Sequence, residues 1–359
     1  MRYSRPLAAS ALLLGAAFLG LGVHASPTPP QSIVVGVGAD ETQRTVTWLS
    51  SMRTGAVKVD GKVVPAESRR TQVGLFTHTA TFPITPGTHV SYSVGAGGNW
   101  SAPRRLEAPA SSESFSFAFL GDPQVGVRSI EEDSAGWRAA TDAATAKDVD
   151  FLISGGDQVQ QGIRPHYRGF FANEALRTHA WAVANGNHDN RNRAAFVQRF
   201  GRAERHWAFE WKGVKFLMLD GNEPETIADF LRGQRPGAWT IAVIHQPPYT
   251  QGKLNATAEY IRDNLTGAFA DSGIDLVLSG HNHSYTRSHP IEGVTYVAAN
   301  SSSGSKFYEL DGPVKGTTAA WNQDFTPDFT VVRVEEDRLS VSSRNVGNKK
   351  VVDEFTINH

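Results

Sequence analysis

Five short stretches of this chain place a polar, ligand-type side chain directly after an apolar run, and this pattern constrains the fold more than any other feature. The clearest is Ile153-Ser154-Gly155-Gly156-Asp157, where two glycines and a carboxylate end the run. The others are Gly121-Asp122-Pro123-Gln124, Gly186-Asn187-His188-Asp189, His245-Gln246-Pro247-Pro248 and Gly280-His281-Asn282-His283. Open α/β sheets bind ligands at the carboxyl ends of their strands. The pattern therefore predicts strands that deliver these side chains to one edge.

The spacing of the stretches supports this interpretation. Asp122 and Asp157 are 35 positions apart, the span of one βαβ unit, and an alanine-rich segment with helical periodicity lies between them at 133–147. Further strands are expected at 115–120, 149–154, 180–184, 240–244 and 274–279, and a helix at 257–270. Antiparallel strands are expected at 206–211, 214–219, 330–335, 339–345 and 351–357. Together they predict an α/β domain over 114–359, with two packed mixed β-sheets flanked by helices.

The amino-terminal part of the chain has a different hydrophobic pattern. Short β-rich runs at 33–37, 45–50, 56–59, 75–82 and 89–94 are separated by turn residues, without any helical period. This spacing predicts a small antiparallel all-β sandwich domain over 30–108. The polar stretch from Pro103 to Glu113 is expected to be the linker between the two domains.

The first 25 residues resemble a secretory signal peptide. Arg2 and Arg5 precede an apolar stretch from Leu7 to Val23, and Val23-His24-Ala25 supplies the small-residue cleavage site. The alternative is an uncleaved membrane anchor, since about 17 apolar residues is the lower limit for a span. Cleavage after Ala25 predicts a secreted or periplasmic protein with no stable membrane insertion.

Charge and cysteine content narrow the chemistry. The formal net charge of the 359 residues is −1, which provides no basic field for a nucleic acid duplex, so a small-molecule ligand is favoured. The chain has no cysteine, which excludes thiolate zinc sites, cysteine nucleophiles and disulfides. Any metal must be held by oxygen and imidazole nitrogen.

Each stretch taken alone is compatible with an ordinary turn or a structural histidine. The coincidence of five strand ends carrying Asp, Asn, Gln or His, in a chain with only 12 histidines, indicates a metal centre. Oxygen and imidazole ligands suit manganese, iron or zinc, and a carboxylate such as Asp157 can be shared between two divalent or trivalent ions.

The order of these motifs resembles that of calcineurin-like metallophosphoesterases, from Phe115 to about Ala299. The amino-terminal strands, with Ser91-Tyr92-Ser93-Val94 before Asn99-Trp100-Ser101, resemble the fibronectin-type III module of purple acid phosphatases. The run from His281 to Arg287, which continues to Tyr-x-Arg, is similar to the same branch.

The resemblance implies a role for each residue of the motifs. Asp122 and His283 would bind the first metal, Asp157 would bridge, and Asn187, His245 and His281 would bind the second. Two positions depart from the family pattern. Gln124 stands where many members have a histidine ligand, and Gln160 stands where the purple enzymes have an iron-binding tyrosine. The first metal would then have only a possible amide oxygen from Gln124.

The expected activity is the hydrolysis of a small phosphate ester. Two cations about 3.5–4 Å apart would activate a bridging hydroxide for attack and clamp the phosphoryl oxygens. His188 would act as the general acid, with Asp189 holding its ring. A phosphomonoesterase of the acid phosphatase type is favoured. The alternatives are a phosphodiesterase acting on nucleotides or phospholipid head groups, and a non-catalytic binding protein with a degenerate site. The sequence does not indicate an oligomeric state.

Overall fold

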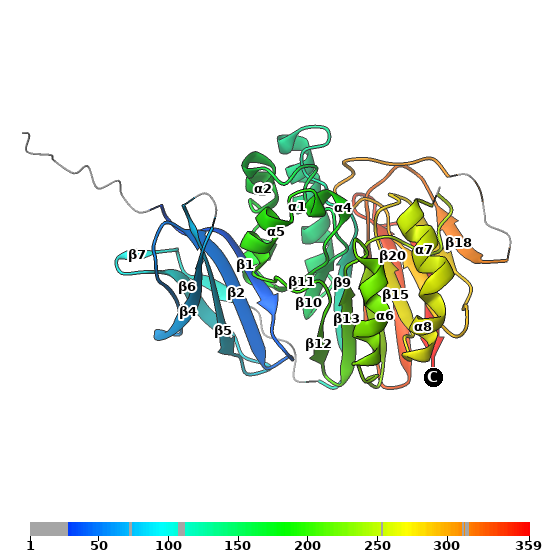
Figure 1. Cartoon of the computed structure of the whole chain (residues 1–359), viewed down its shortest axis with the longest axis horizontal. Coiled ribbons are helices and arrows are strands. Elements are labelled where there is room, and N and C mark those ends of the chain that lie inside the picture. The colour runs from blue at the N-terminus through cyan, green and yellow to red at the C-terminus, as the bar shows by residue number, and fades with distance from the viewer. Residues whose placement is uncertain (1–27, 72–73, 107–111, 253, 311, 313–315) are drawn as a thin grey trace, which may run out of the picture.

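The computed structural model describes residues 28–71, 74–106, 112–252, 254–310, 312 and 316–359 (Figure 1). The expected signal peptide lies outside these residues. The predicted fold class is confirmed, since two mixed β-sheets pack face to face with helices on their outer sides. The described residues form a 14-stranded sheet and a 7-stranded sheet.

The amino-terminal strands enclose a small core of their own, built around Trp48, Phe82 and Tyr92. The strands are β1 (Gln31–Val37), β2 (Gln43–Ser50), β3 (Gly55–Val59), β4 (Lys62–Arg70), β5 (Phe76–Pro83), β6 (Val90–Ala96), β7 (Asn99–Trp100) and β8 (Arg104–Leu106). Three of them, β4, β7 and β8, were not predicted from the sequence, and β7 is only two residues long. β4 was not expected because it is largely exposed, and β8 lies inside the expected linker, where it pairs with β6 and buries Leu106.

The amino-terminal strands also join the larger sheet. β1 pairs in parallel with β11 (Ala180–Val183), with Gly36 opposite Trp181, and the hydroxyl of Tyr92 donates to the carbonyl of Arg177 at 2.7 Å. The larger sheet therefore runs continuously in the order β21-β20-β19-β9-β10-β11-β1-β2-β5-β4-β3-β6-β7. The sequence did not predict this continuity.

The central part of the larger sheet contains the first three ligand-bearing segments. Its remaining strands are β9 (Phe115–Leu120), β10 (Phe151–Ser154), β19 (Asp328–Val334), β20 (Arg338–Asn345) and β21 (Val351–Asn358). The helices of this part are α1 (Ile130–Thr145), α2 (Arg164–Phe170), α3 (Ala175–Thr178), α4 (Asn187–Asn190) and α5 (Arg193–Phe200). α1 begins earlier than predicted because Ser129 caps it by accepting from the backbone N–H of Glu132.

The second sheet carries the histidine-bearing segments. Its strands are β12 (Trp207–Trp211), β13 (Val214–Leu219), β14 (Thr240–Ile244), β15 (Leu276–Ser279), β16 (Tyr285–Ser288), β17 (Thr295–Ala298) and β18 (Thr318–Asn322). The short helix η1 (Pro224–Thr226) and helices α6 (Ile227–Arg232), α7 (Ala256–Asn264) and α8 (Thr266–Asp271) accompany them. The single helix expected at 257–270 is wrong, because Leu265 leaves the helical conformation and buries its side chain in the core beneath α7 and α8.

Successive side chains of the central strands point to opposite faces of the sheet, and this alternation forms the layers of the domain. Phe117 and Phe119 of β9 face the second sheet, whereas Ala118 and Leu120 face α1 and α2. The second sheet is likewise covered on its other face by α6, α7 and α8, which lie on its near side in Figure 1. The result is a helix, sheet, sheet, helix sandwich whose central core is apolar.

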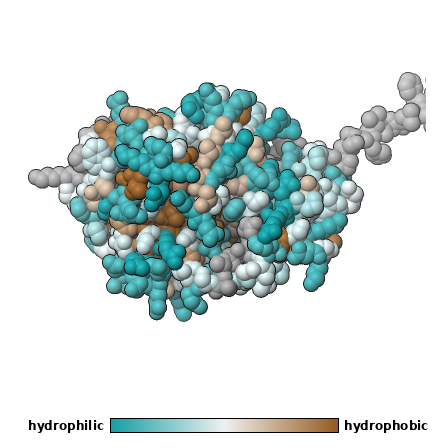
Figure 2. Space-filling model, turned by 180° about the vertical axis from the view of Figure 1, so that it is seen from behind, coloured by the Kyte–Doolittle hydropathy of each residue, from teal (hydrophilic) through white to brown (hydrophobic). Residues whose placement is uncertain are grey.

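No helix among the described residues is long and apolar enough to cross a bilayer. Seen from behind, the molecule is mostly hydrophilic, and apolar side chains gather only in small patches (Figure 2).

The packing between the sheets yields a first prediction. Phe117 is fully buried, and its ring centroid lies 5.3 Å from those of both Phe151 and Phe216. Replacing it with alanine should lower the free energy of unfolding by about 3–5 kcal/mol, because the surrounding side chains cannot fully close the cavity that the missing ring leaves. Urea denaturation measures this change. Phe325→Ala, at a site 54% exposed, is the control and should shift stability by no more than about 0.5 kcal/mol. Equal losses for both variants would contradict the proposed core.

Candidate metal centre

The predicted ligands lie at the carboxyl ends of neighbouring parallel strands in both sheets. β9, β10 and β11 are parallel neighbours, and they are followed by Asp122, Asp157 and Asn187. β14 and β15 are parallel neighbours in the facing sheet, followed by His245 and by the pair His281 and His283. The ligand-bearing edges of the two packed sheets therefore lie next to each other.

These side chains converge closely. The Nε2 atom of His245 lies 3.3 Å from Oδ2 of Asp157 and 3.2 Å from Oδ1 of Asn187. It is also 3.3 Å from Nδ1 of His281. Asp157, His245 and His281 each offer one ligand atom, and these atoms all lie within 4.8 Å of one another. Such a cluster has the dimensions of a metal site.

Asp122 and His283 form the other side of the cluster. Oδ1 of Asp122 lies 3.4 Å from Nε2 of His283 and 4.0 Å from Nε2 of His245. Oδ2 of Asp122 accepts a hydrogen bond from the backbone N–H of His281 at 2.7 Å. One carboxylate oxygen thus holds the loop, and the other is directed at the imidazoles.

The backbone is strained at these positions. Among the described residues, 12 non-glycine residues have positive φ, and five of them are predicted ligands: Asp122, Gln124, Asp157, His281 and His283. Positive φ is uncommon for side chains other than glycine and often accompanies function. The clustering of this conformation at the predicted ligands supports a binding role for the site.

Backbone carbonyls fix the orientation of two imidazoles. Nδ1 of His245 lies 2.8 Å from the carbonyl of Gly155, and Nδ1 of His283 lies 2.8 Å from that of Lys306. A carbonyl can only accept, so each Nδ1 donates its proton there, and Nε2 is the atom that faces the site and could coordinate a cation. Second partners of this kind are typical of metal-ligating histidines.

The electrostatics of the site favour a cation. Burial alone would lower the pKa of the His245 imidazole, but the Asp157 carboxylate raises it to about 10. Burial would likewise raise the pKa of Asp157, but His245 lowers it below its usual range. Oδ1 of Asp122 is buried and has no hydrogen-bond partner among the described residues. Two buried carboxylates beside imidazole Nε2 atoms, which could release a proton to a bound cation, fit the donor set that manganese, iron or zinc would need.

The two positions that depart from the family pattern contact each other. Nε2 of Gln124 donates to Oε1 of Gln160 at 2.9 Å, and Oε1 of Gln124 is buried without a hydrogen-bond partner in the described part of the chain. The amide of Gln124 is therefore held by its nitrogen, and its oxygen remains available. This arrangement is compatible with an amide-oxygen ligand.

The structure corrects the expected partner of His188. Nδ1 of His188 lies 2.9 Å from the backbone carbonyl of Gln160, so this carbonyl orients the ring, and Asp189 does not. Asp189 is buried and accepts from the backbone N–H groups of Gly186 and Gln158, which stabilises the loop instead. Nε2 of His188 lies 3.9 Å from Oδ2 of Asp157, at the edge of the cluster.

Sequence reasoning missed several neighbours of the site. Nδ2 of Asn255 lies 2.8 Å from Nε2 of His281, and the ring of Tyr308 packs edge-on against His283. Asn255 also caps α7, and neither Asn255 nor Tyr308 belongs to a motif found in the sequence. Tyr285 and Arg287 of the Tyr-x-Arg run bind Asp353 on β21.

Comparison with known proteins identifies the domain. The family model for calcineurin-like phosphoesterases matches residues 115–285, which include all the predicted ligands and His188. The chain therefore contains a calcineurin-like phosphoesterase domain, and the predicted family is confirmed. A family of this kind implies a metal centre, and the clustered ligands provide a candidate for it.

Two of the similar proteins are purple acid phosphatases. Purple acid phosphatase 21 of Arabidopsis thaliana is 24% identical over 249 residues, covering 61% of this chain and 54% of the relative, so the chain spans about half of that protein. The structure of the purple acid phosphatase PPD1 from seeds of yellow lupin (Lupinus luteus) superposes with a TM-score of 0.71 and 16% identity, covering 92% of this chain and 74% of the other. The structure of PhoD gives a TM-score of 0.64 and 10% identity, covering 92% and 89%. At these identities the two structures demonstrate the fold alone.

A glycine in the site yields the second prediction. A β-carbon at Gly280 would lie 2.4 Å from Oδ2 of Asp122, so Gly280→Ala should displace this carboxylate and reduce metal content and turnover together. Elemental analysis after gel filtration measures the metal. The matched control is Gly267→Ala in α8, where nothing lies within 4 Å of the new carbon and neither quantity should change. Normal metal content in Gly280→Ala would show that the position of Asp122 does not matter.

Proposed function

We propose that the chain is an exported, metal-dependent phosphomonoesterase that hydrolyses small phosphate esters. The observation that carries the proposal is the convergence of Asp157, His245 and His281 at facing sheet edges, with His188 beside them. Arg2 and Arg5 precede an apolar run that ends at Val23, and this order supports export through a signal peptide.

Two cations would be held by the residues that the family pattern assigns. Asp122, His283 and the amide oxygen of Gln124 would hold the first, Asp157 would bridge, and Asn187, His245 and His281 would hold the second. Bound there, iron, manganese or zinc ions would supply positive charge to the phosphoryl oxygens and lower the pKa of water. The neutral oxygen of Gln124 and the absence of a tyrosine at position 160 support a colourless centre.

The orientation of His188 supports a role as the proton donor to the leaving group. Its Nδ1 proton is engaged by the Gln160 carbonyl, so Nε2 is the atom that exchanges protons with a substrate. In the imidazolium form, the Nε2 proton passes to the ester oxygen as the bond to phosphorus breaks, and the ring is left neutral. The ring is 13% exposed, which leaves it accessible to a substrate.

The third prediction tests the proposed reaction. The metal-loaded protein should hydrolyse p-nitrophenyl phosphate faster than bis-p-nitrophenyl phosphate. The variant Asp157→Asn should lose metal and activity together, because the carboxylate of Asp157 would balance the charge of both cations. The matched control is Asp275→Asn. Asp275 is a half-buried carboxylate that precedes β15, at the end of the strand opposite to the ligands, so this variant should retain both metal and activity. Preference for the diester would indicate a phosphodiesterase. Bound metal without turnover of either ester would indicate a binding protein.

The fourth prediction concerns the general acid. His188→Ala should lower turnover of an alkyl phosphate by about 10²–10⁴-fold while metal content stays normal. A p-nitrophenyl ester should lose less, because its leaving group needs little protonation. His289→Ala, at an exposed histidine outside the site, is the control. Equal losses for the two esters would mean that His188 positions phosphate rather than donating a proton.

A further inference from the structure

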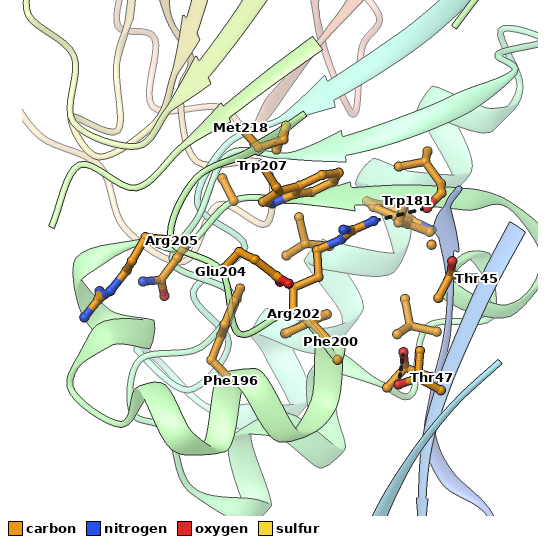
Figure 3. Close-up of a pocket in the computed structure, with 18 of the residues that line it drawn as sticks. Thr45, Thr47, Trp181, Phe196, Phe200, Arg202, Glu204, Arg205, Trp207 and Met218 are labelled. Atoms are coloured by element: carbon orange, nitrogen blue, oxygen red, sulfur yellow. Dashed lines mark hydrogen bonds between the residues drawn. The ribbon is translucent and has the colours of Figure 1, made fainter. Parts of the chain in front are cut away.

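A cavity of about 290 Å³ lies between the amino-terminal strands and the segment around α5 (Figure 3). Thr45 and Thr47 of β2 line one side, and Phe196, Phe200 and Trp207 line the other. None of the seven predicted metal ligands lines it. The volume is at the lower end of the range for small-molecule sites, so the cavity is large enough for a compact organic ligand.

Arg202 brings to this cavity a positive charge that has no ion-pair partner among the described residues. Its guanidinium stacks over the ring of Trp207 at 3.8 Å, and its one hydrogen bond is a long one, 3.5 Å from Nη2 to the carbonyl of Val37. Among the described residues no carboxylate lies within 4.0 Å of it. A half-buried arginine without a counter-ion is suited to binding an anion.

The acidic residues of the cavity already have partners or face solvent. Asp220 is buried and accepts hydrogen bonds from Arg205 at 2.9 Å and from Asn185 at 3.0 Å. Glu67 is exposed and lies 3.5 Å from Arg69, and Glu204 is exposed. The charge of Glu204 acts on Arg202, but none of the three carboxylates forms an ion pair with it, so Arg202 can still pair with an incoming anion.

The remaining polar groups are suited to hydroxyls. Asn185 is 9% exposed, and its buried Oδ1 atom has no hydrogen-bond partner within the described part of the chain, so it can accept from a ligand hydroxyl. The hydroxyls of Thr45 and Thr81 lie 3.1 Å apart, and those of Thr47 and Thr79 lie 3.4 Å apart. Each hydroxyl has one donor and two acceptor positions, so both pairs retain hydrogen-bonding capacity.

We propose that this cavity binds a small polyhydroxylated anion, a sugar that carries a carboxylate or a phosphate group. Arg202 pairs with the anionic group, and the sugar hydroxyls bind the threonine pairs and Oδ1 of Asn185. The carbon face of the ring packs against Phe196 and Phe200. The site is separate from the metal centre, and its occupancy is independent of whether the chain hydrolyses phosphate esters.

Calorimetric titration of the metal-loaded protein tests the proposal with three probes. D-glucuronate carries the carboxylate, glucose 6-phosphonate is a phosphate analogue that cannot be hydrolysed, and glucose carries no charge. At least one of the anions should bind with 1:1 stoichiometry, and glucose should bind much more weakly. Phosphonate binding that persists in the Arg202→Gln variant belongs to the metal centre and does not count towards this cavity.

Variants identify the residues. Arg202→Gln should weaken binding of the anion about 10- to 100-fold, the usual loss for a charge-assisted contact. Arg235→Gln, at an exposed arginine that does not line the cavity, is the matched control and should bind normally. Thr79→Val keeps the side-chain shape and should weaken binding less, and it decides the matter if thermal unfolding shows that Arg202→Gln is misfolded. No saturable binding of either anion at millimolar concentrations, or unchanged binding in both variants, would overturn the proposal.

Discussion

The packing of the two sheets is the interaction on which the candidate metal centre depends. Phe117 and Phe119 of one sheet and Phe216 of the other fill the space between them, and this contact sets how the two carboxyl edges meet. Neither sheet supplies a complete ligand set, because the aspartates and Asn187 follow strands of the first and the histidines follow strands of the second. The centre is therefore a product of tertiary packing.

The local backbone of the site works against stability. A left-handed conformation costs up to about 1–2 kcal/mol for a residue with a side chain, and five predicted ligands adopt it. Their summed cost is comparable to the net stability of a whole domain, about 5–15 kcal/mol. The surrounding core and the bond from the His281 backbone to Asp122 must offset it. Strain that needs such compensation is understandable where side chains must be aimed at a common point.

The strand ends could be predicted from sequence because apolar runs followed by glycine and a polar residue are a local signal. Asp122, Asp157, Asn187, His245 and His281 were found in this way, and the structure brings them together. Contacts between distant segments have no comparable signal. The pairing of β1 with β11 and the bond from His188 to the carbonyl of Gln160 both depend on backbone atoms, which every residue offers. The break at Leu265 was hidden because its flanking residues continue a helical pattern.

The cavity between the amino-terminal strands and α5 could not be predicted from the sequence either. Its walls come from β2, β5 and the segment after α5, which are brought together by the unforeseen continuity of the larger sheet and by contacts of α5 with β1 and β2. Nothing in the sequence indicated that Arg202 would stack on Trp207 and line a cavity. Its lack of a counter-ion becomes visible only once the facing strands are in place.

The two glutamines that depart from the family pattern are best understood as one change. Replacement of an imidazole at position 124 alone would leave an amide free to rotate, and loss of a phenol at position 160 alone would leave a gap. Together they form the bond from Nε2 of Gln124 to Oε1 of Gln160, which fixes the amide and leaves Oε1 of Gln124 as the free atom. Under the proposed ligand set, the first cation then meets only oxygen donors and one imidazole, that of His283. Such a set favours hard divalent ions such as manganese over ions that require a phenolate. The pair thus shifts the preference of one half of the centre and leaves the ligands of the other half unchanged.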